Sequence, residues 1–162
     1  MLGSSVVALA LTPIWSAITK AIAEQDYLWI NSIYKKMKFI AIVGTIAEFL
    51  VIPFAQIVVD IWLKEESIPM EYLYSLAFAS LGSLLLFNQV FSSITNGFGR
   101  LKIQLLCFSI GSILKIPLAW ILVNAMDSWI GVVWANVILL ALYCIVEPLA
   151  INKVLKGRTI SP

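Results

Sequence analysis

Three charged residues of this chain stand inside long apolar runs: Glu48, Lys115 and Glu147. On insertion scales a Lys at the centre of a membrane costs about 2.5 to 3.5 kcal/mol, against a gain of only about 0.3 to 0.6 kcal/mol for each Leu or Ile. Charges in such positions therefore usually face the interior of a helix bundle or a wet cavity, where they bind ions or substrates. These three side chains are the first candidates for a chemical role.

Lys115 belongs to a stripe of small residues at helical spacing, formed with Cys107, Gly111 and Ala119. Small residues let a neighbouring helix approach closely, so the stripe predicts a protein-facing side. Three roles for Lys115 stay open. Its amine could neutralise Glu48, present positive charge to an anionic substrate in a water-filled cavity, or extend outward to the membrane surface.

The depths of Glu48 and Lys115 make a contact between them feasible. Counted from the basic residues before each run, at about 1.5 Å per residue, Glu48 lies about 15 Å and Lys115 about 20 Å into the membrane. A Lys side chain can span the difference. Glu48 also has a stripe of small residues on its helix, at Ala41, Gly44 and Ala55. The sequence thus allows a mutually neutralising pair of Glu48 and Lys115.

Two further polar stripes lie in the apolar runs. Glu147 shares a helical face with Asn136 and Tyr143, which predicts a cavity or a neighbouring helix on that side. Glu147 is also close enough to the end of its run to be hydrated at the interface. The second stripe forms a polar edge that hydrogen bonds between helices would explain, and it consists of Asn88, Ser92, Thr95 and Asn96.

The sequence contains few residues of the types that covalent catalysis or metal binding requires. The absence of histidine excludes His-ligated metals and Ser-His or Cys-His dyads. Cys107 and Cys144 lie in apolar runs and are interpreted as small hydrophobic side chains. We expect no enzyme activity, no catalytic residue, no bound metal and no cofactor. The net charge of +2 gives no argument for nucleic acid.

The composition indicates which elements hold these residues. Of 162 residues, 61% are hydrophobic and only 12% charged, whereas soluble domains carry about 25% charged residues. Continuous apolar runs of roughly 20 residues predict membrane-crossing helices, not the alternating segments of a barrel. We therefore predict an all-α integral membrane protein, with residues 1–162 forming a single transmembrane domain. The five predicted spans are 2–19, 39–59, 72–95, 103–123 and 129–151.

The segments between the predicted spans are short and polar. Residues 20–38 form the longest and predict an amphipathic stretch at the membrane interface. Residues 96–100 and 126–128 carry turn signals. Pro53, Pro117 and Pro148 lie within spans and predict kinks.

Basic residues are distributed unequally between the two predicted sides of the membrane. One side carries nine, namely Lys20, Lys35, Lys36, Lys38, Arg100, Lys102, Lys153, Lys156 and Arg158. The other side carries Lys64 alone. Because cytoplasmic loops collect Lys and Arg, we predict the N-terminus outside and the C-terminus in the cytoplasm.

Several short motifs resemble one known family in combination. They are Thr12-Pro13-Ile14-Trp15 with Ala21, Gln25 and Asp26, then Ile61-Trp62-Leu63, then Asn96-Gly97-Phe98-Gly99-Arg100, and Gly131 at the start of the last span. Together they resemble the Wzx-type flippases of lipid-linked oligosaccharides (the O-antigen and polysaccharide exporters of the MOP superfamily). The resemblance covers nearly the whole chain.

This resemblance implies a twelve-helix transporter of the bacterial or archaeal cytoplasmic membrane, working by alternating access. The chain would supply the last five helices, and we expect such a fragment to be inactive without the N-terminal lobe, from the same or a separate chain. The implied partners are membrane lipid and a polyprenyl-diphosphate-linked glycan. The candidate substrate-binding residues are Lys115, Glu48, Glu147 and Asn96.

Three other functions remain open on the sequence. A cation-coupled multidrug exporter lobe of the MATE type would centre on membrane-embedded acids instead of Lys115. A membrane remnant would have no activity of its own. A membrane enzyme acting on polyprenyl phosphate would need clustered carboxylates for Mg²⁺, whereas the acids here are scattered.

Overall fold

The computed structural model describes residues 14–63 and 71–159, and these form helices joined by tight turns. The helix Ile14–Ala23 comes first. The others are α2 (Tyr27–Val51), the short 3₁₀ helix η1 (Ile52–Phe54), α3 (Ala55–Leu63), α4 (Tyr72–Phe98), α5 (Lys102–Met126) and α6 (Ile130–Thr159). No strand occurs within the described ranges. The all-α prediction is confirmed there.

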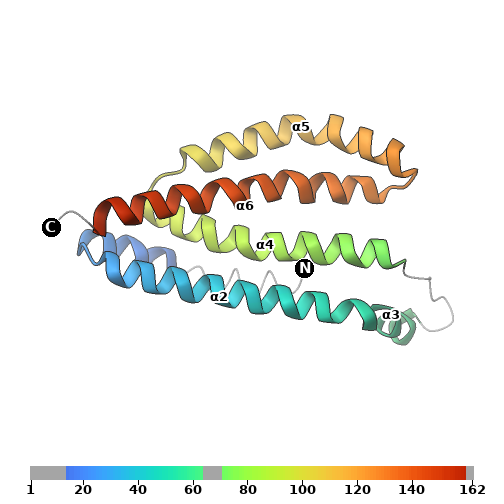
Figure 1. Ribbon diagram of the computed structural model, residues 1–162, viewed down its shortest axis with the longest axis horizontal. Helices are drawn as coiled ribbons and strands as arrows, with labels where there is room; N and C mark the ends of the chain where they lie inside the picture. The colour runs from blue at the N-terminus through green and yellow to red at the C-terminus, as the bar shows by residue number, and fades with distance from the viewer. Residues whose placement is uncertain (1–13, 64–70, 160–162) are drawn as a thin grey trace.

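The four longest helices lie side by side in the order α5, α6, α4, α2 (Figure 1). α5 packs chiefly on α6, α6 on α4, and α4 on α2. Successive helices run in opposite directions, so α2 and α5 begin at the end of the bundle where α4 and α6 finish. We call this the α6 C-terminal end. The arrangement keeps α2 and α5 at opposite edges of the bundle.

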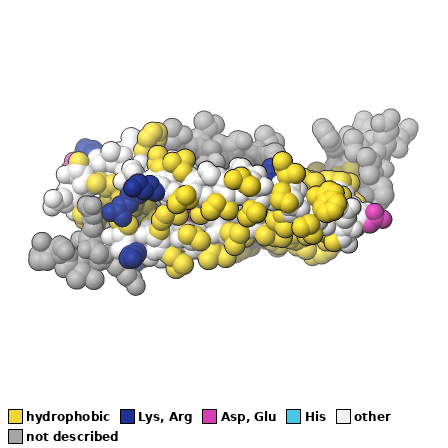
Figure 2. Space-filling view, turned by 90° about the horizontal axis from the view of Figure 1, so that it is seen from above, with side chains coloured by type: hydrophobic (Ala, Val, Ile, Leu, Met, Phe, Trp, Pro, Cys, Tyr) yellow, Lys and Arg dark blue, Asp and Glu magenta, His cyan; other side chains and the backbone are white. Residues whose placement is uncertain are grey.

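Four stretches are long and apolar enough to cross a membrane: Tyr27–Ile61, Tyr72–Phe98, Lys102–Met126 and Ile130–Leu155. Many of their apolar side chains face outward, and Ile116 on α5 is 78% exposed. In water such exposure would be unfavourable by about 25 cal/mol for each Å². Figure 2 shows apolar side chains along most of one face, with Lys and Arg gathered toward one end. The apolar outer surface of the described helices is therefore suited to the hydrocarbon interior of a membrane.

The first predicted span, residues 2–19, falls mostly outside the described residues. Its described part belongs to the helix Ile14–Ala23. The number of five spans therefore stays a prediction.

The second half of the predicted interfacial stretch, residues 20–38, is part of a long helix, and its place at the membrane interface stays a prediction. A helical turn ends near Gln25, and α2 then begins at Tyr27, where Asp26 caps it by accepting the Trp29 backbone N–H at 2.9 Å. From there the helix continues without interruption into the predicted second span. The reason is packing, because the inward-facing side chains recur at helical spacing along it: Ile30, Tyr34, Met37 and Ala41.

Proline affects the helices unequally. At Pro53, one of the three predicted kinks, the α-helix is interrupted, since η1 separates α2 from α3. Pro117 and Pro148 lie inside α5 and α6, and both helices continue through them.

The two predicted turns are confirmed, and one begins later than expected. Asn96 and Gly97 remain in α4, and the chain turns at Gly99, which has a φ of +64°. Glycine adopts this left-handed conformation without steric cost. At the other turn Asp127 takes a φ of +46° directly after α5.

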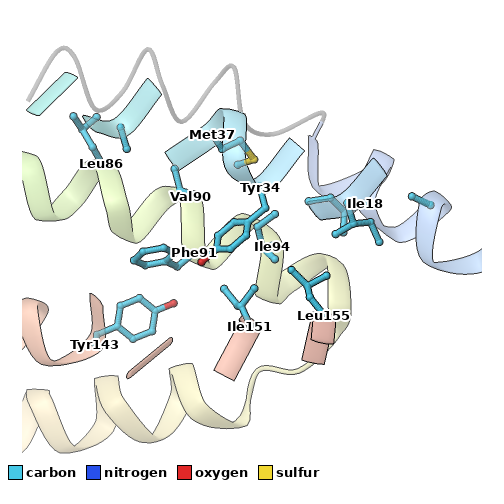
Figure 3. Packing of buried hydrophobic residues seen from close by; sticks show 13 residues of the cluster. Ile18, Tyr34, Met37, Leu86, Val90, Phe91, Ile94, Tyr143, Ile151 and Leu155 are labelled. Atoms are coloured by element: carbon cyan, nitrogen blue, oxygen red, sulfur yellow. The ribbon is translucent and has the colours of Figure 1, made fainter. Parts of the chain in front are cut away.

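The buried core is concentrated toward the α6 C-terminal end. Figure 3 shows its main members: Ile18, Tyr34, Met37, Leu86, Val90, Phe91, Ile94, Tyr143, Ile151 and Leu155. Ile18 comes from the helix Ile14–Ala23 and packs against Gly97 of α4. α5 contributes no fully buried side chain. The helices thus pack most tightly where Glu147 lies and more loosely around Lys115.

Candidate functional site

The two predicted polar stripes on α4 and α6 face each other across the helix interface. Thr95 donates a hydrogen bond from its hydroxyl to Glu147 Oε1 at 2.5 Å. The Glu147 side chain is 1% exposed and Thr95 2%. One turn away, the Ser92 and Tyr143 hydroxyls lie 3.3 Å apart. The prediction of hydrogen bonds between helices at the α4 edge is confirmed.

Further polar side chains, about one helical turn from Thr95 and Glu147, extend from this interface toward the middle of the bundle. Ser92 also contacts Asn88 at 3.4 Å and accepts a hydrogen bond from Gln104 of α5 at 3.4 Å. We call the whole set the polar strip, and it consists of Asn88, Ser92, Thr95, Gln104, Tyr143 and Glu147. Three helices contribute to it, so their relative positions are tied to its hydrogen bonds.

Two aromatic side chains, Phe108 and Tyr34, lie beside the polar strip. Tyr143 stacks on Phe108 of α5, with ring centroids 4.9 Å apart. Tyr34 approaches from α2 and belongs to the same buried core as Tyr143. Figure 3 shows both tyrosines with their hydroxyls turned toward the interior of the core. The Tyr34 hydroxyl has no hydrogen-bond partner among the described residues.

A cavity of about 460 Å³ opens beside Glu147, between the end of α4, the start of α5 and the end of α6. We call it the end cavity. Thr95 and Glu147 line its inner wall, and Arg100 and Lys153 line it as well. Both cationic side chains are exposed. The cavity therefore carries charges of both signs.

A second cavity, of about 540 Å³, lies deeper in the bundle and is lined by Lys115; we call it the Lys115 cavity. Asn88 of α4 and Asn136 of α6 line it too, so its polar groups come from three helices. Cys107 and Gly111 also line it, but an added Cβ at Gly111 would meet nothing within 4 Å, so close approach of a neighbouring helix at this stripe stays a prediction. Lys115 is exposed and has no ion-pair partner among the described residues. Asn88 belongs both to this cavity and to the polar strip.

The predicted pair of Glu48 and Lys115 is not formed. Glu48 on α2 accepts a hydrogen bond from Ser83 of α4 at 3.0 Å. Its carboxylate lies against Gly82, where an added Cβ would come within 2.7 Å of Glu48 Oε1. Lys115 is on α5, at the opposite edge of the bundle. Similar depth in the membrane does not determine which helices are neighbours.

Asn96 lies apart from both cavities. It occupies the last turn of α4, is half-buried, and its backbone carbonyl accepts the Gly99 N–H at 3.1 Å. Its side chain does not line either of the two cavities described above. The structure therefore brings Glu147 and Lys115 toward one polar strip and leaves Glu48 and Asn96 outside it.

The sequence patterns did not single out Gln104, which belongs to the polar strip, or Ser83, which holds Glu48 outside the strip. Gln104 lies in the first turn of α5, two residues after Lys102. Ser83 is one serine among several in an apolar run. The available signal was helical spacing, since Gln104 precedes Gly111 by seven residues and so shares its face.

Comparison with known proteins gives no match, either to a protein-family model, to a curated protein or to a solved structure. The basis for a function is therefore the polar strip and its two cavities.

Proposed function

We propose that the chain supplies helices of a MOP-type exporter that moves a lipid-linked oligosaccharide across a bacterial or archaeal cytoplasmic membrane. The observation that carries this proposal is the Lys115 cavity, in which an exposed lysine without a described ion-pair partner and two asparagine side chains line the same hollow of an apolar helix bundle. The motif resemblance to Wzx-type flippases supports the same function.

The chemistry of the Lys115 cavity suits the diphosphate of a polyprenyl-linked glycan. Opposite unit charges at 4 Å attract by about 4 kcal/mol at an effective dielectric of 20, against about 1 kcal/mol in water. Asn88 and Asn136 can add neutral hydrogen bonds, although the Asn136 side-chain nitrogen also donates to the Val132 carbonyl at 2.9 Å. We therefore assign Lys115 the role of binding the diphosphate headgroup, and Asn88 and Asn136 the role of orienting it.

The polar strip gives the headgroup a route beyond the Lys115 cavity. A flippase must offer a polar path across hydrocarbon, because an unsolvated diphosphate cannot cross it. The strip connects Asn88, which lines the Lys115 cavity, through Ser92 to Thr95 and Glu147 beside the end cavity. Because much of this strip is buried between α4 and α6, rocking of the two lobes of a twelve-helix transporter would have to open it to either side.

The drug-exporter alternative is weaker on this geometry. It needs a carboxylate at the centre of the binding cavity, whereas the described lining of the Lys115 cavity includes no acid. Glu48 and Glu147 are each engaged by a hydroxyl group from α4. An anionic ligand is therefore favoured over a cationic one.

Binding of an isoprenyl diphosphate tests the proposal. We expect the purified chain in detergent to bind farnesyl diphosphate more tightly than farnesol, measured by native mass spectrometry. Lys115→Gln removes one charge-assisted hydrogen bond of about 1.5 to 3 kcal/mol and should weaken diphosphate binding about tenfold or more. Lys115→Arg keeps the charge and should retain part of the affinity.

Lys102→Gln is the matched control, because Lys102 is an exposed lysine of the same helix that does not line the Lys115 cavity. It should leave diphosphate binding within about twofold of the unmodified chain, as expected for a distant surface charge. Equal losses from Lys115→Gln and Lys102→Gln would show that diphosphate responds to net charge and not to the Lys115 cavity, and the proposal would fail.

A further inference from the structure

The second oxygen of the Glu147 carboxyl group has no hydrogen-bond partner among the described residues, although it is fully buried. Thr95 holds the other oxygen. Leaving a buried acceptor unsatisfied costs about 1 to 3 kcal/mol, and more when the group is charged. Because Glu147 lines the end cavity, a small rotation of its side chain would bring the free oxygen to a donor bound in that cavity.

The cationic side chains of the end cavity do not supply this donor. Arg100 and Lys153 line the same cavity, but neither forms an ion pair with Glu147 or with any other described acid. Lys153 lies six residues beyond Glu147 on α6, about 9 Å along the helix axis. The negative group is thus at the inner wall, and the positive groups are nearer the end of the bundle.

The rest of the end cavity is largely apolar, with Phe98, Ile103 and Val154 in its lining. Its volume of about 460 Å³ falls within the range of about 300 to 1,000 Å³ typical of small-ligand sites. It lies at the end of the membrane-crossing segments, where lipid headgroups are located. An occupant must therefore combine a negative group, a hydrogen-bond-donating cation and apolar parts.

We propose that the end cavity binds the headgroup of a phospholipid bearing a primary ammonium group, such as phosphatidylethanolamine. The lipid phosphate contacts Arg100 and Lys153, while its ammonium group reaches inward and donates to the free oxygen of Glu147. Basic pockets between helices at a membrane boundary are known to hold lipid phosphates. The carboxylate adds a requirement for an ammonium group that can donate. Such a lipid occurs in either leaflet, so the proposal does not depend on which end is cytoplasmic.

The headgroup requirement separates three lipids with the same acyl chains. Phosphatidylethanolamine offers both groups, phosphatidylcholine has a quaternary ammonium that cannot donate, and phosphatidylglycerol brings no cation to Glu147. We expect the purified chain in detergent to bind phosphatidylethanolamine about tenfold more tightly than the other two, as one charge-assisted hydrogen bond allows. Native mass spectrometry of lipid titrations measures the three affinities.

Two variants test the two halves of the site. Glu147→Gln keeps the acceptor for Thr95 but removes the charge, and it should reduce phosphatidylethanolamine binding to the level of phosphatidylcholine. Arg100→Gln combined with Lys153→Gln should weaken the binding of all three lipids. The matched control is Lys35→Gln with Lys36→Gln, which removes two exposed cations of α2 that do not line the end cavity. This control should keep the preference for phosphatidylethanolamine.

A soluble headgroup distinguishes a membrane lipid from a free phosphoamine. Glycerophosphoethanolamine lacks the acyl chains and should fail to displace the lipid at equal concentration; equal displacement would overturn the assignment to a lipid. Equal binding of the three lipids by the unmodified chain, or an unchanged preference in Glu147→Gln, would overturn the proposal. If Glu147→Gln does not fold, the proposal is still tested by the lipid preference of the unmodified chain and by the variants of the exposed Arg100 and Lys153. The Lys115 cavity is untouched by these changes, so diphosphate binding tests the transport function separately.

Discussion

The charged side chains inside the membrane segments differ in what stabilises them. Glu147 is almost wholly buried and is held by Thr95, whereas Glu48 is half-buried and is held by Ser83. Lys115 has no described ion-pair partner and remains exposed on α5. Each acid is thus bonded to a neutral hydroxyl on α4, and the cation is left available for a ligand.

This separation predicts how substitutions of Glu48 and Lys115 combine. Their helices lie at opposite edges of the bundle, so Glu48→Gln and Lys115→Met should change the free energy of unfolding additively, within about 0.3 to 0.5 kcal/mol. Glu48→Gln and Ser83→Ala affect one hydrogen bond and should show a coupling energy of about 0.5 to 3 kcal/mol. Denaturant titrations in micelles measure both cycles. Coupling in the first cycle and none in the second would support an ion pair between Glu48 and Lys115 in place of the hydrogen bond between Glu48 and Ser83.

The helices show where sequence patterns were sufficient and where they were not. Long apolar runs predicted α4, α5 and α6 to within a few residues at their start, because hydrocarbon demands a continuous helix of about 20 residues. The start of α2 was missed, since its lysines indicated an interface. In the structure Lys35 and Lys36 are exposed while Tyr34 and Met37 pack inward. A helix can leave the membrane boundary and continue, and hydropathy alone does not reveal this.

Close packing between helices predicts opposite effects for two Gly→Ala substitutions. A Cβ at Gly97 would lie 2.8 Å from Ile18 Cβ and would push the helix Ile14–Ala23 away from α4. We expect Gly97→Ala to lower the free energy of unfolding by about 1 to 3 kcal/mol, as overpacking does. At Gly111, on α5, an added Cβ meets nothing within 4 Å. Gly111→Ala should leave stability unchanged or raise it by up to about 1 kcal/mol.

Thermal unfolding in detergent measures both glycine variants. A loss at Gly111 equal to that at Gly97 would mean that another helix covers the open side of α5. A silent Gly97→Ala would mean that the contact with Ile18 is not maintained in solution.

At the scale of the whole molecule, the sequence indicated the polar stripes but not their partners. The stripe of Glu147 and Tyr143 was visible on one helix, and that of Ser92 and Thr95 on another. Their meeting depends on α4 and α6 being neighbours. Helical period fixes which residues share a face, whereas the order of helices in a bundle is set by the sum of all packing contacts. For the same reason the proposed contact of Glu48 with Lys115 failed.

The distribution of charge over the bundle predicts its orientation in the membrane. Lys35, Lys36, Arg100, Lys102 and Lys153 all lie toward the α6 C-terminal end, where α2 and α5 begin. The turn at the other end, between α5 and α6, carries Asp127 and no basic residue. Because the cytoplasmic loops of membrane proteins are enriched in Lys and Arg, we expect the α6 C-terminal end to be cytoplasmic.

Single added cysteines, in a chain with Cys107→Ser and Cys144→Ser, test this orientation with a membrane-impermeant maleimide. Lys36→Cys and Lys153→Cys should react only after the cells are permeabilised, whereas Asp127→Cys should react in intact cells. The two sites on α2 and α6 act as controls for each other, since the antiparallel packing places them at the same end. Reaction of Lys36→Cys and Asp127→Cys from the same side would contradict the helix arrangement itself. The reverse pattern at all three sites would keep the arrangement and invert it, because the basic end would then lie outside.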